Sequence, residues 1–114
     1  PHPAWDTLVR VTAQVRKAHG LDIHIGRHLA ALLRAAGLQD VAVQAFSLVW
    51  KPGDLYQYLL INFAELHREK IVDAGLLSDQ EMTDLGESLR AHLDQPETLV
   101  VHPLLFQAWG RKPG

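Results

Sequence analysis

Apolar residues recur at helical spacing in the first third of the chain. In residues 5–19 the apolar positions fall on one face, and Gly20 suits the left-handed end of the predicted helix. A second helix is predicted over residues 25–36, and Gly37 ends it. The stripe of the first helix is Trp5, Leu8, Val11 or Thr12, and Val15, and that of the second is Leu29, Leu32, Leu33 and Ala36.

The period of the apolar pattern changes after Gly37. Residues 41–50 are rich in β-branched and aromatic side chains, with turn signals before them at Gln39-Asp40 and after them at Lys51-Pro52-Gly53. These features predict a strand. Apolar groups alternate onto both of its faces, which is typical of a sheet that is covered on both sides.

Two more helices are predicted before the last strand. Asp54 stands where a helix cap is expected and Gln57 follows three residues later, so a long helix is predicted over residues 54–74. The capping box Ser78-Asp-Gln-Glu81 predicts another helix over residues 79–93.

The C-terminal segment is strand-like, but it contains Pro103, which cannot donate to a ladder. The regular strand is therefore predicted over residues 104–111. About four helices and two strands indicate the α/β fold class, and 114 residues is the length of a single domain. Because two strands alone are marginal without more sheet, the elements favour part of a larger layered α/β body.

Composition narrows the classes of partner. The formal net charge is −2 and no more than two basic residues are adjacent anywhere in the chain, so no nucleic-acid partner is expected. The absence of cysteine excludes disulfides, thiolate metal sites and a catalytic thiol, and it fits a cytoplasmic location. The longest apolar stretch, residues 58–64, is too short to span a bilayer, so no membrane partner is expected. The opening Pro1-His2-Pro3 lacks the apolar core of a signal peptide, and it is interpreted either as a loop inside a longer protein or as a remnant of an expression tag.

Several motifs together resemble one enzyme family. The segment Asp22-Ile-His-Ile-Gly-Arg-His-Leu-Ala-Ala-Leu-Leu-Arg-Ala-Ala-Gly-Leu-Gln-Asp-Val41 resembles a stretch near the end of class I S-adenosylmethionine-dependent methyltransferases of the bacterial small-molecule type. In that family a Gly-Arg-x-Leu motif starts a helix that ends in Ala-Gly-Leu before a strand. The likeness continues in Pro52-Gly53-Asp54, Asp73-Ala-Gly-Leu-Leu-Ser78 and Gly110-Arg-Lys-Pro113, and it covers essentially the whole chain.

The resemblance implies a place in a Rossmann-like methyltransferase fold. The family has a seven-stranded sheet whose last two strands form an antiparallel pair. Residues 41–50 and 104–111 would be this two-stranded antiparallel pair, and the helices of residues 54–95 would be an insertion that roofs the substrate pocket. The chain would then be the C-terminal half of a parent enzyme that methylates a small-molecule acceptor.

The cofactor residues of that family are missing from the chain. The family binds S-adenosylmethionine through an acidic residue and a Gly-x-Gly turn, where only glycine lets the backbone approach the ligand. No Gly-x-Gly occurs here, so no residue of this chain is assigned to the cofactor. The parent is expected to bind S-adenosylmethionine, whereas the chain alone is expected to bind no cofactor and to be inactive.

The longest predicted helix holds the candidate site. Residues 55–64 are apolar around nearly the whole helix, which indicates enclosure on several sides. Core packing is the ordinary interpretation, and the alternative is that Tyr56, Tyr58 and Phe63 bind the substrate. At least one of these rings is expected to face a cleft or another molecule. His67 lies on the same predicted side as Tyr56 and Phe63 and is the best candidate for a general base, although the catalytic residue stays unknown.

Other candidate groups lie near the second predicted helix. His24 and His28 stand four residues apart with Asp22 nearby, a spacing that could hold zinc on one helical face. No third ligand stands at a useful spacing, so no metal site is predicted. Arg27 could contact an anion, and an ion pair with Asp22 at the helix start is the favoured alternative.

A second function class stays open. The chain could be a stand-alone, non-enzymatic module that dimerises and binds a ligand or a partner. Both interpretations predict self-association of the isolated chain, because the outer edge of the strand at residues 104–111 would present unpaired backbone groups to another copy.

Overall fold

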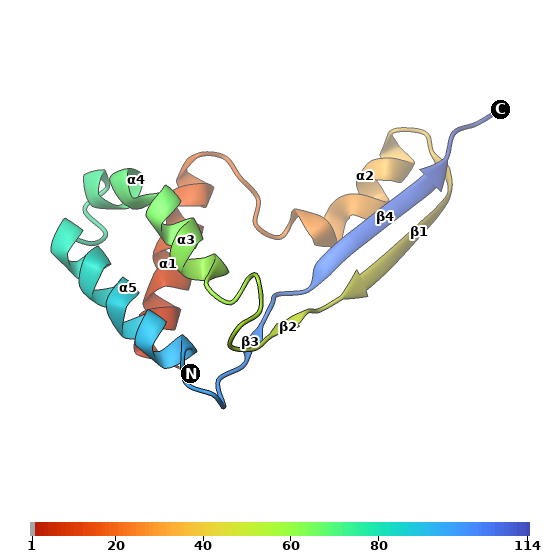
Figure 1. The fold of residues 1–114 in the computed structure, drawn as a ribbon. Coiled ribbons are helices and arrows are strands. Elements are labelled where there is room, and N and C mark those ends of the chain that lie inside the picture. The colour runs from red at the N-terminus through yellow and green to blue at the C-terminus, as the bar shows by residue number, and fades with distance from the viewer. Residues whose placement is uncertain (1) are drawn as a thin grey trace. The chain divides into compact units, whose positions relative to one another are not determined.

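The computed structural model describes residues 2–114, which contain five α-helices, a 3₁₀ turn and four strands (Figure 1). Pro1, the first residue of the predicted opening loop, lies outside the described residues. The chain divides into two compact units. The helical unit comprises the segment through Leu21 together with Val49–Val100, and the sheet unit comprises Asp22–Leu48 and Val101–Gly114. No helix within residues 2–114 is long and apolar enough to cross a membrane.

Four helices make up the helical unit. They are α1 (Pro3–Ala18), α3 (Leu59–Leu66), α4 (Arg68–Asp73) and α5 (Asp79–Leu93), which lie together in Figure 1. Every buried apolar residue of the described chain belongs to this unit. These residues are Ala4, Leu8, Val11, Val15, Ile61, Ala64, Ile71, Leu77, Met82, Leu89, Leu93 and Val100. The helical unit therefore has a hydrophobic core of its own.

The helix predicted over residues 5–19 is confirmed as α1. Pro3 occupies the first helical turn, where its missing N–H has no intrahelical partner to lose. The His2 ring accepts the backbone N–H of Ala4 at 3.2 Å and caps the helix. Thr12 is buried but satisfied, because its hydroxyl donates to the Leu8 carbonyl at 2.8 Å. The apolar face of α1 can therefore pack into the core without an unpaired polar group at Thr12.

The helix predicted to open at Asp54 begins instead at Leu59. The residues before Leu59 form successive turns, in which the Asp54 carboxylate accepts the N–H of Lys51 at 2.7 Å. The buried Gln57 amide donates to the Leu93 carbonyl at 2.9 Å, at the end of α5. Gln57 thus satisfies a helix-end carbonyl 36 residues away through its amide nitrogen, while its Oε1 accepts the N–H of Gly53 at 2.8 Å within the turn.

The predicted long helix is also interrupted at His67, between α3 and α4. In a continuous helix the Phe63 carbonyl would accept the backbone N–H of His67. The His67 ring takes that carbonyl instead, with Nδ1 at 2.9 Å, and the His67 N–H bonds to the Ala64 carbonyl at 3.1 Å. This competition between side chain and backbone explains the break.

The helix predicted over residues 79–93 is confirmed as α5, and its cap is the predicted one. The Ser78 hydroxyl accepts the N–H of Glu81 at 3.0 Å, and the Glu81 carboxylate accepts the N–H of Ser78 at 3.1 Å. Both N–H groups would otherwise lack a partner at the helix start. The local signal was sufficient here because both capping residues lie within four positions of each other.

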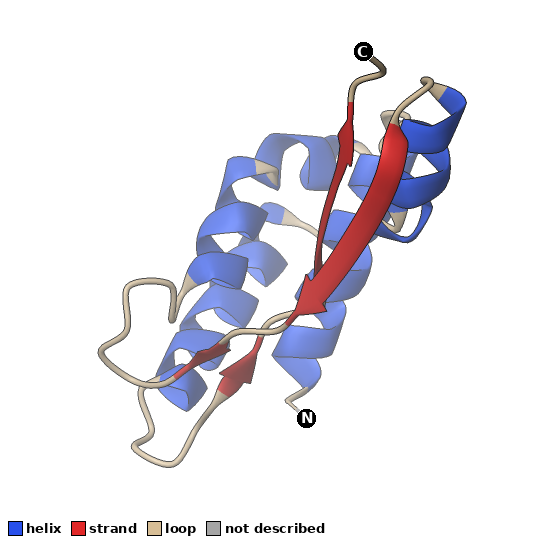
Figure 2. Cartoon of the chain, turned by 90° about the vertical axis from the view of Figure 1, so that its right-hand side faces the viewer, coloured by secondary structure: helices blue, strands red, loops and turns tan. Residues whose placement is uncertain are grey.

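The sheet unit is a pair of long strands with one helix beside it (Figure 2). Its elements are the 3₁₀ turn η1 (Ile25–His28), α2 (Leu29–Ala35), β1 (Gln39–Phe46) and β4 (Leu105–Arg111). β1 and β4 pair antiparallel, in a register that places Phe46 opposite Leu105. The mixed α/β class, the second helix and the antiparallel pairing of the two predicted strands are confirmed, although the first turn of that helix is 3₁₀.

β1 ends at Phe46, so the strand predicted over residues 41–50 is not continuous. On the opposite strand Pro103 has no N–H for the ladder. Next to this position the Ser47 hydroxyl donates to the His102 carbonyl at 2.7 Å, and the His102 N–H donates to the Leu48 carbonyl at 2.8 Å. A second two-stranded sheet follows, formed by β2 (Val49–Trp50) and β3 (Val100–Val101).

The expectation that the sheet is covered on both faces is wrong, because no residue of β1 is buried. Phe106 lies against Gly26 of η1, where an added Cβ would come within 2.7 Å of the Phe106 ring. Side chains alternate along a strand, so Leu105 and Trp109 share the opposite face, to which Phe46 belongs through its pairing with Leu105. Trp109 and Phe46 are 50% and 40% exposed. The sheet unit therefore leaves apolar side chains open on one face.

We expect Leu89→Ala to lower the free energy of unfolding of the helical unit by about 2–5 kcal/mol, since this core side chain would leave a cavity. Leu66→Ala is the matched control, because Leu66 is 78% exposed. Its expected loss is about 0.5 kcal/mol or less. Urea unfolding followed by circular dichroism measures both losses. Equal losses would contradict the assignment of Leu89 to the core.

Candidate functional site

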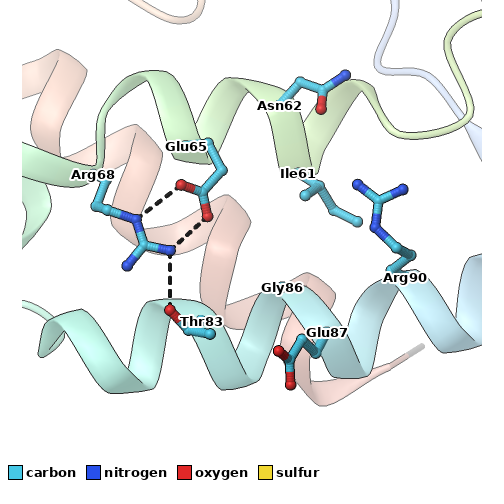
Figure 3. A pocket seen from close by; sticks show the side chains of 8 residues that line it. All are labelled: Ile61, Asn62, Glu65, Arg68, Thr83, Gly86, Glu87 and Arg90. Atoms are coloured by element: carbon cyan, nitrogen blue, oxygen red, sulfur yellow. Dashed lines mark hydrogen bonds and ion pairs between the residues drawn. The ribbon is translucent and has the colours of Figure 1, made fainter.

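An open groove lies between α3 and α5 of the helical unit (Figure 3). This α3–α5 groove has a volume of about 220 Å³. It is lined by Ile61, Asn62, Glu65 and Arg68 on one side and by Thr83, Gly86, Glu87 and Arg90 on α5. Cavities that enclose drug-sized ligands are larger, about 300–1,000 Å³. The groove therefore suits a small group or a single side chain.

One end of the α3–α5 groove is occupied by hydrogen bonds around Arg68. Nε and Nη2 of Arg68 donate to the two carboxylate oxygens of Glu65 at 2.8 and 2.7 Å, and Nη1 donates to Oδ1 of Asp79 at 2.9 Å. The hydrogen bonds from Arg68 lower the pKa of Glu65, and the bonds to Glu65 and Asp79 raise the pKa of Arg68. Arg68 is therefore engaged within the protein and offers no free guanidinium fork to a ligand.

The other end of the groove carries Arg90, whose guanidinium lies over Tyr58. The Arg90 guanidinium carbon is 4.3 Å from the centre of the Tyr58 ring, which is a cation–π contact. The Tyr58 hydroxyl donates to the Asp94 carboxylate. This hydrogen bond raises the pKa of Tyr58, since the carboxylate stabilises the protonated phenol. Tyr58 thereby joins the turn before α3 to the end of α5.

The middle of the groove is open because α5 has a glycine there, Gly86. A Cβ added to Gly86 would meet no atom within 4 Å, so packing does not require glycine. A glycine inside a helix costs about 0.5–1 kcal/mol relative to alanine. Gly86 therefore widens the groove at a cost in helix stability.

Tyr56 lies outside both the groove and the helix. Its ring is 5.2 Å from that of Trp50 in an edge-on contact, and the residue is 46% exposed. The predicted alignment of Tyr56 with His67 on one helical face is wrong, because the helix begins only at Leu59. Tyr56 therefore belongs to the turn that follows β2.

Phe63 and His67 meet Arg16, which comes from α1. The centres of the Phe63 and His67 rings are 4.5 Å apart. The Arg16 guanidinium carbon lies 5.0 Å from the centre of the Phe63 ring. All three residues are half-buried, and together they are named the Arg16 cluster.

The predicted substrate residues thus occupy three places rather than one pocket. None of Tyr56, Tyr58 and Phe63 is buried, which confirms that the three rings are not all core residues. Arg16 and Arg90 were missed from the sequence, although each stands next to a core position of its helix. Long basic side chains at such positions often cover apolar surface, but the sequence does not say which ring each one covers.

The histidines near α2 lie apart from these contacts. Asp22 accepts the backbone N–H of His24 at 2.8 Å, and no ion pair of the described residues joins Asp22 to Arg27. The ion pair expected at the helix start is therefore wrong. Across residues 2–114 no group of three or more His, Asp or Glu side chains is placed to hold a metal ion.

Comparison with known proteins adds no identity. No protein-family model matches the chain, and no curated protein or solved structure matches it significantly. Function therefore rests on the residues and their geometry.

We expect Asp94→Asn to lower the raised pKa of Tyr58, because the carboxylate that stabilises the protonated phenol is removed. A pKa raised on folding contributes stability below the unfolded-state pKa, and this contribution is lost as the pH rises through the folded-state pKa. Ultraviolet titration measures the change, and Tyr58→Phe assigns the signal because the chain has only two tyrosines. Asp84→Asn, elsewhere on α5, is the control. An unchanged Tyr58 titration in Asp94→Asn would rule out this hydrogen bond.

Proposed function

We propose that this chain is the C-terminal, substrate-side portion of an S-adenosylmethionine-dependent methyltransferase that acts on a small molecule. One observation carries the proposal. The antiparallel strands β1 and β4 bracket α3, α4 and α5 in the sequence, and β1 directly follows the helix that begins after Gly26. This is the order that the resemblance implies for the last two strands of a Rossmann-like methyltransferase and the helical insertion between them.

The glycines of two resembling motifs support this placement. Gly26, from the Gly-Arg motif, lies too close to Phe106 for any Cβ. At Gly110, from the Gly-Arg-Lys-Pro motif, a Cβ would lie 3.0 Å from Cβ of Leu38 and 3.1 Å from Cγ2 of Val41. Gly26 therefore allows Phe106 of β4 to pack closely against η1, and Gly110 allows β4 to pack closely against Leu38 and Val41. Each motif thus has a structural role within the sheet unit.

The low burial of the sheet unit supports the proposal that this chain is part of a larger enzyme. No residue of β1 is buried by β4 or by the helix beside the two strands. A sheet of only two strands is marginally stable by itself. Additional strands and helices of the parent would cover the open face around Phe46 and Trp109. The sheet unit would then complete the sheet, and the helical unit would give the acceptor pocket its shape.

In the proposed reaction this chain would mainly align the methyl acceptor. Bound S-adenosylmethionine supplies the methyl group, and the enzyme mainly positions the acceptor for direct displacement. Tyr56, Tyr58 and Phe63 are the candidate acceptor contacts, and His67 is the candidate base. Because the Phe63 carbonyl can only accept, Nδ1 of His67 carries the proton and Nε2 of the neutral ring is left to accept one. The proposal includes a cytoplasmic location, which the cysteine-free composition supports.

The second candidate is a stand-alone, non-enzymatic dimeric module that binds a ligand or partner. The open sheet face with Phe46 and Trp109 favours it, since exposed apolar surface marks interfaces. The outer edge of β4 also offers unpaired backbone groups to a second copy. The two candidates differ in whether a cofactor-binding half accompanies this chain.

We expect the protein encoded by the complete reading frame to bind S-adenosylmethionine with a dissociation constant below about 10 μM, near −7 kcal/mol. The 114-residue chain alone is expected not to bind at that level, because it has no Gly-x-Gly turn. Isothermal calorimetry measures both, and transfer of a labelled methyl group to a small molecule tests activity.

Two outcomes would contradict the methyltransferase proposal. One is a reading frame without a Gly-x-Gly turn whose product ignores S-adenosylmethionine. The other is micromolar binding by the 114-residue chain itself. A frame confined to this chain, together with a dimer in sedimentation equilibrium, would favour the stand-alone module.

A further inference from the structure

The guanidinium of Arg16, within the Arg16 cluster, has no anionic partner among the described residues. Arg16 is half-buried, and its Nε atom is fully buried with no hydrogen-bond partner. No ion pair within residues 2–114 involves Arg16. Because desolvating a charge is costly, half-buried guanidinium groups normally have an acceptor. The Arg16 guanidinium therefore has no counter-ion among the described residues, and only its terminal nitrogens can meet an acceptor from outside.

The surroundings of Arg16 orient its guanidinium but do not neutralise it. The face of the Phe63 ring and the C-terminal end of α1 both favour a cation. The acceptors at that helix end are already used: the Val15 carbonyl contacts the His19 ring at 2.8 Å, and the Arg16 carbonyl accepts the N–H groups of His19 and Leu21. The terminal N–H groups of Arg16 are thus left for an acceptor from outside the helix.

We infer that the Arg16 cluster binds the carboxylate of a small aromatic or aliphatic acid. A carboxylate matches the planar guanidinium fork in a bidentate pair. The cluster has one permanent cation, which balances a monoanionic carboxylate better than a phosphate dianion. The half-buried Phe63 ring beside Arg16 supplies an apolar wall for the body of the acid.

Besides being the candidate base, His67 positions Phe63 in this arrangement. Its ring packs on Phe63, and its Nδ1 bond to the Phe63 carbonyl fixes the ring relative to the helix. Phe63 is thereby held next to the Arg16 guanidinium. The inference rests on the proposed function in one respect, which is that the bound acid would be the methyl acceptor.

The experiment is a titration of the 114-residue chain with benzoate, followed by nuclear magnetic resonance of the Arg16 Nε–H and the backbone amides. We expect saturable shifts at Arg16 and Phe63 with a dissociation constant of about 1–10 mM. Benzyl alcohol, a neutral analogue, is expected to bind at least about tenfold more weakly because it cannot form the charge-assisted pair.

Variants of two arginines on α1 separate a site from general charge attraction. Arg16→Gln is expected to weaken benzoate binding at least about tenfold, and Arg16→Lys by less, since lysine keeps the charge but not the fork. Arg10→Gln is the matched control, because Arg10 is exposed on the same helix. It is expected to change binding by less than about twofold. Circular dichroism checks folding, and Arg16→Lys keeps the comparison valid if Arg16→Gln unfolds.

Three results would overturn the inference: benzoate that leaves Arg16 unmoved, equal weakening by the Arg10 and Arg16 variants, or tighter binding of inorganic phosphate than of benzoate. Failure of this inference is separable from failure of the proposed function. If the complete protein binds S-adenosylmethionine while the chain ignores benzoate, only the acid site is refuted. If benzoate binds through Arg16 while the complete protein ignores S-adenosylmethionine, only the methyltransferase proposal is refuted.

Discussion

The packing of α1 against α3, α4 and α5 is the interaction on which the rest of the structure depends. Leu8 and Val11 of α1 are buried together with Ile71, Met82 and Leu89 from the later helices. Burying one such side chain contributes about 1.5–3 kcal/mol, and all buried apolar residues of the described chain lie in this unit. Because α1 precedes the sheet unit in the sequence and the other helices follow β1, this core closes a loop of chain that contains α2 and β1.

The sheet unit depends on backbone pairing and one helix instead of a buried core. Gly26 and Gly110 allow close contacts in this unit, and its ladder ends at the pair Phe46 and Leu105, just after Pro103. On the other face of the sheet unit Trp109 is exposed to solvent. This contrast between a packed unit and an open one is what the proposed function explains, since a sheet of the parent enzyme would supply the missing cover. The candidate ligand contacts, including the Arg16 cluster, all belong to the helical unit.

The sequence predicted the elements whose signals are local. The capping box at Ser78 and the apolar stripe of residues 5–19 define α5 and α1, because the interacting residues lie within one or two turns. The start of α3 could not be predicted in this way, because Gln57 bonds to a carbonyl 36 residues away. For the candidate site, Phe63 and His67 were recognised as neighbours on a helix. Their contact with Arg16 is tertiary, and no spacing in the sequence contains it.

Amide hydrogen exchange of the isolated chain tests the central claim most directly, namely that the helical unit supports itself whereas the sheet unit belongs to a larger sheet. Exchange from a well-packed element requires global unfolding, whereas a weakly buried element opens locally at a lower free energy. The account predicts slow exchange in the middle of α1 and α5 and much faster exchange along β1 and β4, even at their paired N–H groups. Protection of β4 equal to that of α5 in a monomeric chain would show that these two strands are already complete, and it would contradict the account.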